Sequence, residues 1–503
     1  MDLYFLENEF WYGACVKYGV KMPIDTETEE ELDFSTNTTP NQARPLLVSS
    51  KGRYIWRETG FCAKFNRGTI TVPDDCQVEH PGKNLRDAYL GAMERHFPFT
   101  GKMPARELFE KLIYNSWIEL TFFQNEKDIL EYAEKILKSG MPAGVLMIDD
   151  GWAESYGDWR FHSGKFLEPE KMLKRLHEMG FQVMLWVSPY ITPDTVKFRE
   201  AESLGILVNN PDGETYITRW WNGYSAVLDM SNPEAQKWLK NQFDMLTRIG
   251  VDGFKFDGGD SVYYREDNQT FGHVTPDEQC RLWTVFGEQY PFNEFRASVK
   301  AGGRSLFQRL CDKDHSWGDS GVASLLPDTL LQGITGHPYG CPDMIGGGEY
   351  MNFQEMAQSR LDGELFVRHA EIACLLPGMQ FSAAPYRVLS REDFEAVKRS
   401  IQTREEYLPY IMGELEKTCV NGEPLVRYLA YEFPEEPVEK ITDEFMLGSR
   451  YLVAPVCGKG QKGRKIYLPK GTWKRDGELL ESQGNWIFAD SVAGIPVILE
   501  RMK

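Results

Sequence analysis

The sequence lacks the features that membrane proteins and nucleic-acid-binding proteins need. Among its 503 residues, no stretch approaches the ~18 uninterrupted apolar residues of a membrane-spanning helix. Basic residues are in the minority, with 56 Lys and Arg against 75 Asp and Glu, and the net charge is −19. This sign argues against nucleic acid or an anionic membrane as a partner, whereas a neutral sugar stays open. The first residues show no basic segment followed by an apolar run, so we expect no signal peptide.

The short motifs of several enzyme classes are also missing. The nine cysteines form no CxxC pair, a pattern typical of reduced thiols in a cytoplasmic protein. The eight histidines are dispersed without HxH or HExxH, so we expect no metal site. Neither the GxSxG nucleophile elbow nor the GxxxxGKS/T phosphate loop occurs. We therefore expect a protein that works without a metal or other cofactor.

What the sequence does contain indicates a large folded protein with three regions. Hydrophobic residues make up 42% and aromatic residues 13%, enough for an extensive core. Residues 1–114 are turn-rich and strand-like, which favours a β-rich, sandwich-like domain. Residues 115–436 alternate strand and helix patterns. Residues 437–503 return to short strands and predict a small C-terminal β-domain.

The middle region predicts a parallel sheet covered by helices. Helix starts are expected at Asn125, Pro169 and Asn232, and helix ends at glycines such as Gly140 and Gly180. Near-continuous apolar strands alternate with these amphipathic helices, which favours a (β/α)₈ TIM barrel; a doubly wound open sheet is the alternative. No GxGxxG follows the first strand to support a dinucleotide-binding version. The expected strands are 117–122, 144–149, 182–187, 252–257, 305–310, a stretch near 332–336, 378–382 and 425–433.

Polar side chains recur where the predicted strands end. In a barrel these carboxyl ends meet at one mouth, where active sites are built. A single Asp after a strand is usually a turn residue, but the same pattern at several strand ends is harder to explain in this way. The residues concerned are Asp149 and Asp150 after the second strand, Trp186 on the third, Lys255 and Asp257 on the fourth, Arg309 on the fifth with Asp319 beyond it, and Asp343 after the sixth.

The segment GVDGFKFDGGD, residues 250–260, places two ions in a strand that otherwise reads as buried. Lys255 and Asp257 are two residues apart and so point to the same face. A buried ion pair is seldom a net stabilising device, which favours a catalytic use over a purely structural one. Glycoside hydrolysis needs two carboxyl groups in one pocket, and indole rings stack on sugars. Gly258 and Gly259 would let the chain turn and leave space for the sugar.

Four segments together resemble glycoside hydrolase family 31. They are GVDGFKFDGGD, HSWGDS, CPDMIGGGE and FMLGSRYLVAPV with the later YLPKGTW. The resemblance runs from about Trp117 onward and implies a β-sandwich, a (β/α)₈ barrel and a C-terminal β-domain. It also implies a retaining α-glycosidase in which Asp257 is the nucleophile and Asp319, within Trp317-Gly318-Asp319, is the acid/base.

The same resemblance implies the residues that bind the sugar. Lys255 would touch the sugar, Asp149 falls where the family has a hydroxyl-binding aspartate, and the fifth-strand arginine matches Arg309 best, with Arg304 as the competitor. Arg309 precedes Asp319 by ten residues, a shorter spacing than is usual in the family. The complete set of expected substrate-binding residues is Asp149, Trp186, Lys255, Arg309, Trp317 and Asp343.

We therefore expect an exo-acting retaining α-glycosidase that removes a terminal sugar from an oligosaccharide or glycoside by double displacement. The short N-terminal region resembles a compact branch of the family with α-galactosidase-like members, and the choice between α-galactoside and α-glucoside is open. A transglycosylase with the same catalytic pair and a catalytically inactive carbohydrate-binding relative are the alternatives. Formation of a homo-oligomer is also left open by the sequence.

Overall fold

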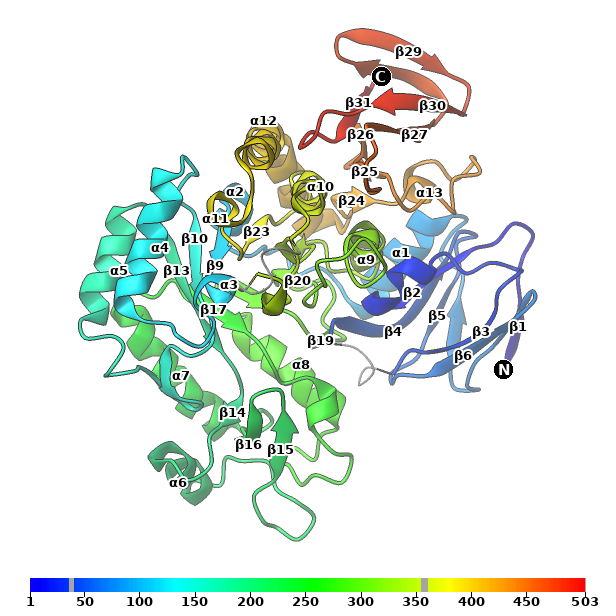
Figure 1. The fold of residues 1–503 in the computed structure, drawn as a ribbon. Coiled ribbons are helices and arrows are strands. Elements are labelled where there is room, and N and C mark those ends of the chain that lie inside the picture. The colour runs from blue at the N-terminus through cyan, green and yellow to red at the C-terminus, as the bar shows by residue number, and fades with distance from the viewer. Residues whose placement is uncertain (36–39, 354–360, 503) are drawn as a thin grey trace.

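The computed structural model describes residues 1–35, 40–353 and 361–502. Figure 1 shows three groups of strands. The N-terminal strands (blue) lie at one side of the barrel, and the C-terminal strands (red) lie at the top of the view. Helices α4, Glu126–Lys138, and α5, Pro169–Glu178, cover the outside of the barrel on the far side from the N-terminus. The predicted fold class, a TIM barrel flanked by β-domains, is confirmed.

The barrel is one sheet of nine parallel strand segments, in the order β21-β20-β18-β17-β13-β10-β9-β23-β22. The segments β21 and β22 are consecutive along the chain and stand at the two ends of this order, so the sheet nearly closes. The segments are β9 Ile113–Asn115, β10 Val145–Ile148, β13 Gln182–Val187, β17 Gly253–Phe256, β18 Phe292–Phe295, β20 Gln308–Arg309, β21 Gly340–Cys341, β22 Met344–Ile345 and β23 Gln380–Phe381.

The helices around the barrel begin and end where the local sequence predicts. The side chain of Asn125 caps α4 by accepting from the Asp128 amide, and Asn232 caps α7 in the same way. Gly140 and Gly180 follow α4 and α5 with φ of 86° and 93°, a conformation that favours glycine. The remaining helices are α3 Trp117–Leu120, α6 Val196–Ser203, α7 Pro233–Arg248, α8 Pro276–Gly287, α9 Val322–Ile334, α10 Gly363–Ala373, α11 Pro385–Val388 and α12 Arg391–Asn421, with short 3₁₀ turns η3 Ser261–Tyr263 and η4 Tyr350–Asn352.

Three of the predicted barrel strands are wrong. Residues 117–122 begin with the helical turn α3, closed by the Leu120 amide on the Ser116 carbonyl at 2.9 Å, and the first strand is β9 just before it. Residues 332–336 lie at the end of α9. Residues 425–433 contain β24, Val426–Arg427, and α13, Leu429–Glu432, and β24 pairs antiparallel in the C-terminal sheet. The stretches 117–122 and 425–433 are rich in apolar and aromatic residues, a composition that helix and strand share, whereas 332–336 has Ile334 as its single large apolar residue.

The fifth barrel strand is β18, which the sequence pattern missed, so β20 is sixth and the broken strand β21/β22 is seventh. In β18 the neighbouring polar residues Asn293 and Glu294 are both buried, on opposite faces of the strand. Asn293 donates to the carbonyls of Tyr290 and Ser305, at 2.8 and 3.1 Å. A strand whose two central buried residues are polar lacks the apolar signal used to recognise it.

The N-terminal region forms two sheets that reach into the barrel region. A parallel pairing of β4 with β19 joins Gln42 to Ser298, directly beyond β18. The four-stranded sheet contains β1 Asp2–Tyr4, β7 Thr69–Thr71, β6 Cys62–Asn66 and β3 Glu29–Asp33. The second sheet contains β19 Ser298–Val299, β4 Gln42–Ser49, β5 Tyr54–Trp56 and β8 Gln77–Glu79, with β2 Trp11–Cys15 paired to β4. The helical segments of this region are η1 Val16–Lys21, α1 Leu85–His96 and α2 Glu107–Glu110.

The C-terminal region forms a six-stranded antiparallel sheet and a separate two-stranded one. Trp473 is fully buried in this domain and donates to the Pro469 carbonyl at 2.8 Å. The division of the chain at residues 114 and 436 stays a prediction. The strands are β24, β25 Phe445–Leu447, β26 Tyr451–Ala454, β31 Val497–Arg501, β28 Gly471–Arg475 and β29 Glu478–Ser482, and then β27 Gly463–Leu468 with β30 Asn485–Asp490.

Two small sheets follow the carboxyl ends of barrel strands β10 and β13. One is the hairpin of β11, Ala153–Ser155, and β12, Asp158–Phe161. The other joins β14 Tyr190–Ile191, β16 Gly223–Val227 and β15 Ile217–Trp220, and lies at the lower edge of Figure 1. Within residues 1–35, 40–353 and 361–502, no helix is both long and apolar enough to cross a membrane.

Candidate active site

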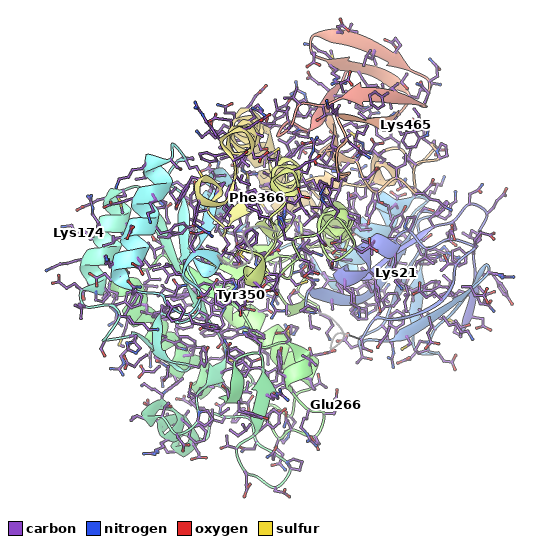
Figure 2. The ribbon with its side chains drawn as sticks, viewed as in Figure 1. Lys21, Lys174, Glu266, Tyr350, Phe366 and Lys465 are labelled. Atoms are coloured by element: carbon purple, nitrogen blue, oxygen red, sulfur yellow. The ribbon has the colours of Figure 1, made fainter. Side chains whose placement is uncertain are left out.

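A cavity of about 740 Å³ opens where the barrel strands end. Its lining combines charged groups from four strand ends, those of β10, β17, β18 and β20, with aromatic rings. Tyr350, labelled in Figure 2, is one of the rim residues. The charged lining residues are Asp149, Asp150, Lys255, Asp257, Asp260, Arg296, Arg309 and Asp312, and the aromatic ones are Trp117, Phe122, Trp186, Trp221, Tyr263 and Tyr350.

Asp257 follows β17 and is held at both carboxylate oxygens. Its Oδ1 accepts from Arg296 Nε at 3.0 Å and from the Gly258 amide at 2.9 Å, and its Oδ2 accepts from Trp186 Nε1 at 3.0 Å. Burial by itself would raise the pKa of Asp257, but the charges of Arg296 and Lys255 outweigh it and hold that pKa well below its usual range. Asp257 is therefore an anion in a fixed orientation.

The two glycines after Asp257 serve the turn but leave no space for a sugar. Gly258 and Gly259 have φ of 66° and 71°, which favours glycine. A Cβ on Gly258 would lie 2.6 Å from the ring of Tyr190, and one on Gly259 would lie 2.7 Å from the ring of Trp283. Aromatic side chains pack against this backbone, so that part of our expectation is corrected.

Lys255 pairs with Asp149. Lys255 Nζ lies 2.7 Å from Asp149 Oδ2, which also accepts from Asn115 Nδ2 at 2.7 Å. Burial lowers the pKa of Lys255, but the carboxylates of Asp149, Asp257 and Glu294 together outweigh it, and the net direction is upward, so the ammonium is charged. Asp149 Oδ1 accepts from the Asp150 amide at 2.8 Å. The second and fourth strand ends therefore meet, as their positions in the barrel predict.

Asp150 faces a different set of partners. Its Oδ2 accepts from Tyr156 Oη at 2.9 Å and from Asn222 Nδ2 at 2.6 Å. Burial and the neighbouring Asp149 raise the pKa of Asp150 to about 7. Asn222 stands at the tip of the β15–β16 hairpin, so this carboxyl group links the hairpin to the barrel.

Arg296 was missed by the sequence reasoning. It comes directly after β18, and its guanidinium holds Asp260 through Nη1 and Nη2, each at 2.9 Å, as well as Asp257 through Nε. Nη1 also donates to the Pro40 carbonyl at 2.6 Å, and Gln42 Nε2 donates to the Arg296 carbonyl at 2.6 Å. The N-terminal domain therefore helps to hold this arginine. The signal in the sequence was an arginine immediately after FNEF.

Arg309 ends β20 and lies beside Asp312, a second residue that the sequence reasoning missed. Arg309 Nη1 donates to Asp312 Oδ1 at 2.8 Å and to Asp343 Oδ1 at 2.6 Å, while Nε lies 3.3 Å from Glu294 Oε1. The side chain of Asp312 is 49% exposed and lines the cavity. Asp343 is fully buried and is not among the lining residues of the described chain. Asp312 is therefore the carboxyl group of this loop that faces the cavity.

The structure does not bring Asp319 or Trp317 to the cavity. Asp319 is exposed and is absent from the cavity lining in the described residues. Trp317 is half-buried, and its Nε1 donates to Asp362 Oδ2 at 3.0 Å. Arg304, the competitor of Arg309, pairs with Glu288 at 2.6 Å and also lies outside the lining. The expected acid and one expected binding residue are thus displaced from the site, because a motif match does not fix where its loop lies.

The rim of the cavity is aromatic on two sides. The Trp221 ring lies 5.4 Å from the Arg296 guanidinium and 5.8 Å from the Tyr263 ring. On the other side, Trp117 packs edge-on against Phe122 at 5.0 Å. Across the described ranges, no group of three or more His, Cys, Asp or Glu side chains is arranged to hold a metal ion. The arrangement offers a charged floor for hydroxyl groups and flat apolar walls above it.

Two family models match the chain. The "Glycosyl hydrolases family 31 TIM-barrel domain" matches residues 108–414, and the "Glycosyl hydrolase family 31 C-terminal domain" matches residues 422–500. The chain belongs to glycoside hydrolase family 31. The family's barrel match includes every charged residue of the cavity described above.

Relatives in the family share the fold at moderate identity. The chain is 33% identical over 417 residues to the myogenesis-regulating glycosidase of Mus musculus, covering 80% of this chain and 57% of that protein. It is 27% identical over 544 residues to the isomaltosyltransferase of Sporosarcina globispora, covering 93% and 48%. The solved Flavobacterium johnsoniae GH31 dextranase, FjDex31A, complexed with glucose, matches with a TM-score of 0.87 at 19% identity, covering 100% and 66%. This chain thus spans about half the length of these curated relatives.

Proposed function

We propose that the protein is an exo-acting retaining α-glycosidase in which Asp257 is the nucleophile and Asp312 is the acid/base. The observation that carries the proposal is that these two carboxyl groups line one cavity in contrasting environments. Asp257 is held by Arg296, Trp186 and a backbone amide, whereas the half-exposed Asp312 faces the same space. Retaining glycosidases need one fixed anionic nucleophile and one carboxyl group that exchanges a proton.

The reaction would proceed in two displacements. Asp257 attacks the anomeric carbon, and Asp312 gives its proton to the leaving glycosidic oxygen as that bond breaks. Asp312, now a carboxylate, then takes a proton from water, and the water oxygen displaces Asp257 from the β-glycosyl enzyme. The free sugar retains the α configuration. Enclosure in the cavity raises the pKa of Asp312, but Arg309 and Lys255 lower it, and the net direction is downward. The negative charge of Asp257 opposes this lowering, and forming the ester removes that charge, which suits Asp312 to act as a base in the second step.

The remaining charged residues would hold the terminal sugar. Asp149 and Lys255 offer an acceptor and a donor that are already paired and buried, and Arg309 adds donors from the other side. A hydroxyl group bound there makes charge-assisted hydrogen bonds, each of ~1.5–3 kcal/mol. Binding one sugar in this way supports exo action, with Trp221 and the other rim rings facing the leaving group.

The sugar that we propose is a terminal α-linked galactose or glucose. The relative that is 33% identical is named a glycosidase, and two others are named α-glucosidases, which supports an α-glycosidase and, for the sugar, glucose. Galactose stays in the proposal because the sequence resembles the compact branch of the family with α-galactosidase-like members. Transfer to a sugar acceptor is a second candidate, because one relative is named an isomaltosyltransferase. A cytoplasmic location is also part of the proposal, supported by nine cysteines that are all free thiols.

A panel of aryl α-glycosides tests the proposal directly. The panel contains the galactoside, glucoside, xyloside, N-acetylgalactosaminide and sulfoquinovoside, each with and without an added acceptor sugar. We expect turnover of the galactoside or the glucoside, with the α anomer formed first in NMR spectra. No turnover of any member would contradict the proposal and favour an inactive carbohydrate-binding relative.

The pair Asp312→Asn and Asp319→Asn tests the assignment of the acid. General acid catalysis contributes about 10²–10⁴-fold, and an activated aryl leaving group needs it least. We therefore expect Asp312→Asn to lose about 100-fold or more on a disaccharide and much less on a nitrophenyl glycoside. Asp319→Asn, the matched control on the same loop, should stay close to wild type on both. The reverse result would return the acid role to Asp319.

A further inference from the structure

Asp343 occupies an unusual position in the barrel. It lies in the gap between β21 and β22, the two halves of the seventh barrel strand, with φ of 88°. The side chain is fully buried, and both oxygens are already engaged. Oδ1 accepts from Arg309 Nη1 at 2.6 Å, and Oδ2 accepts from the Lys313 backbone amide at 2.8 Å. Asp343 is fully buried and lies outside the cavity lining of the described residues, which corrects the binding role expected from the sequence.

Both contacts of Asp343 lead to Asp312. Arg309 Nη1, which donates to Asp343, also donates to Asp312 Oδ1 at 2.8 Å. Lys313 is the next residue after Asp312, so the bond to its amide fixes the backbone beside the acid/base. Glu294 holds the other side of the guanidinium, through Arg309 Nε at 3.3 Å, and Gln380 Nε2 fixes Glu294 at 2.6 Å. The guanidinium thus has a single orientation, set from neighbouring strands.

We propose that Asp343 is a positioning residue that holds the acid/base Asp312 through Arg309 and through the Lys313 backbone. The inference rests on the proposed function, since it assumes that Asp312 exchanges a proton with the glycosidic oxygen. Asp343 shares the positive charge of Arg309 with Asp312. It therefore limits how strongly Arg309 favours the ionised form of Asp312, the form that cannot act as an acid in the first step.

The direction of the electrostatic effect follows from the charges around the network. Enclosure of Asp312 in the cavity raises its pKa, but Arg309 and Lys255 outweigh this effect, and the net direction is downward. Removing the charge of Asp343 would leave more of the Arg309 field on Asp312 and lower its pKa further. The groups that face the network are Lys255 and Asp257 on and after β17, Glu294 on β18, Lys313 after β20, Cys341 on β21 and Asp328 on α9, which pairs with Lys313.

The pH dependence of kcat/KM for the intact protein tests the inference, with one disaccharide and one nitrophenyl glycoside as substrates. The alkaline limb of this profile reports the pKa of the general acid. We expect Asp343→Asn to move the limb to lower pH by about one unit, with the loss concentrated on the disaccharide. Arg309→Gln should move the limb in the opposite direction, because it removes the cation beside Asp312.

Glu444→Gln is the matched control. Glu444 is a fully buried carboxylate that accepts from the Tyr467 amide at 2.9 Å and lies 3.8 Å from Arg464, in the C-terminal domain. Glu444→Gln should leave the alkaline limb of the kcat/KM profile at its wild-type position.

An unmoved limb in folded Asp343→Asn, or an equal loss on both substrates, would reduce Asp343 to a structural residue. If Asp343→Asn does not fold, Arg309→Gln decides alone, and an unmoved limb there also overturns the inference. A wild-type protein that turns over neither substrate overturns the proposed function as well. If the wild type is active but the alkaline limb stays unmoved in the Asp343 and Arg309 variants, only this inference is overturned.

Discussion

Replacing Arg296 by methionine removes the group that ties the nucleophile to its surroundings. Arg296 donates to Asp257, to both oxygens of Asp260 and to the Pro40 carbonyl. Methionine keeps much of the side-chain volume but none of these donors. Asp257 then keeps the bonds from Trp186 and the Gly258 amide, together with the fields of Lys255 and Arg309.

The magnitude follows from the burial of the two carboxylates. Breaking a buried ion pair by removing one partner costs about 3–5 kcal/mol, because the remaining charge is uncompensated. Part of this loss falls on Asp257. Arg296 is the charge that most strongly opposes the effect of burial on the pKa of Asp257, so that pKa rises when Arg296 is removed. A loss of about 3 kcal/mol in the transition state would lower kcat/KM by about 100-fold, since 1.36 kcal/mol corresponds to tenfold.

The pH profile of kcat/KM on a nitrophenyl glycoside measures this change. Asp257 must be ionised to attack, so its pKa sets an acidic limb. We expect that limb to move to higher pH in Arg296→Met. Because the pKa of Asp257 is lowered in the folded wild type, its contribution to stability is present above the unfolded value near ~4 and is lost as the pH falls. Thermal unfolding should therefore show a deficit at neutral pH that shrinks in acid.

Arg304→Met is the control for this prediction. Arg304 lies eight residues beyond Arg296 in the chain and pairs with Glu288 outside the cavity. It should retain wild-type kinetics. An Arg296→Met enzyme with an unmoved acidic limb and less than about a threefold loss would refute the assignment of Arg296 as the counter-ion of the nucleophile.

Two further predictions concern buried charges. Lys255→Met and Asp149→Asn should each lower the free energy of unfolding by several kcal/mol, because each change leaves one buried partner of a 2.7 Å ion pair without its counter-ion. The double variant should lose less than the sum of the two single losses. Additive losses in denaturant titrations would exclude coupling between the two residues. Glu371 on α10 accepts from the Val456 amide at 2.9 Å and from Arg368 at 2.6 Å, so Glu371→Ala should lower the unfolding temperature. Glu392→Ala, at an exposed position in the first turn of α12, should not. Equal melting of these two variants would show that the contact does not join the barrel to the C-terminal domain.

The sequence predicted the half of the site that comes from strongly apolar strands. Asp149, Lys255 and Asp257 end β10 or β17, whose buried residues form unbroken apolar or aromatic runs around them. Periodicity located these strands, and the barrel geometry then brought their ends together. Trp186 on β13 was located in the same way, and its contact with Asp257 follows from that placement.

The other half of the site was missed for one structural reason. In β18 the buried residues Asn293 and Glu294 replace an apolar run, so the strand was not recognised. Each later barrel strand was therefore numbered one too low. Arg309 was then assigned to the fifth strand, and Arg296 and Asp312 were not considered. Pro40 lies far from the barrel in sequence, and long-range contacts such as the pairing of β4 with β19 bring that region to the site. No local pattern encodes such a long-range contact.

Trapping of the glycosyl enzyme tests the central claim most directly. A fluorinated or cyclophellitol-type α-glycoside that matches the sugar turned over in the panel should add one sugar mass to the protein, and peptide mapping should place it on Asp257. Asp257→Ala should stay folded and take up no label. A label on Asp150, Asp260 or Asp312, or a β anomer formed first during turnover, would contradict the assignment of Asp257 as the nucleophile of a retaining enzyme.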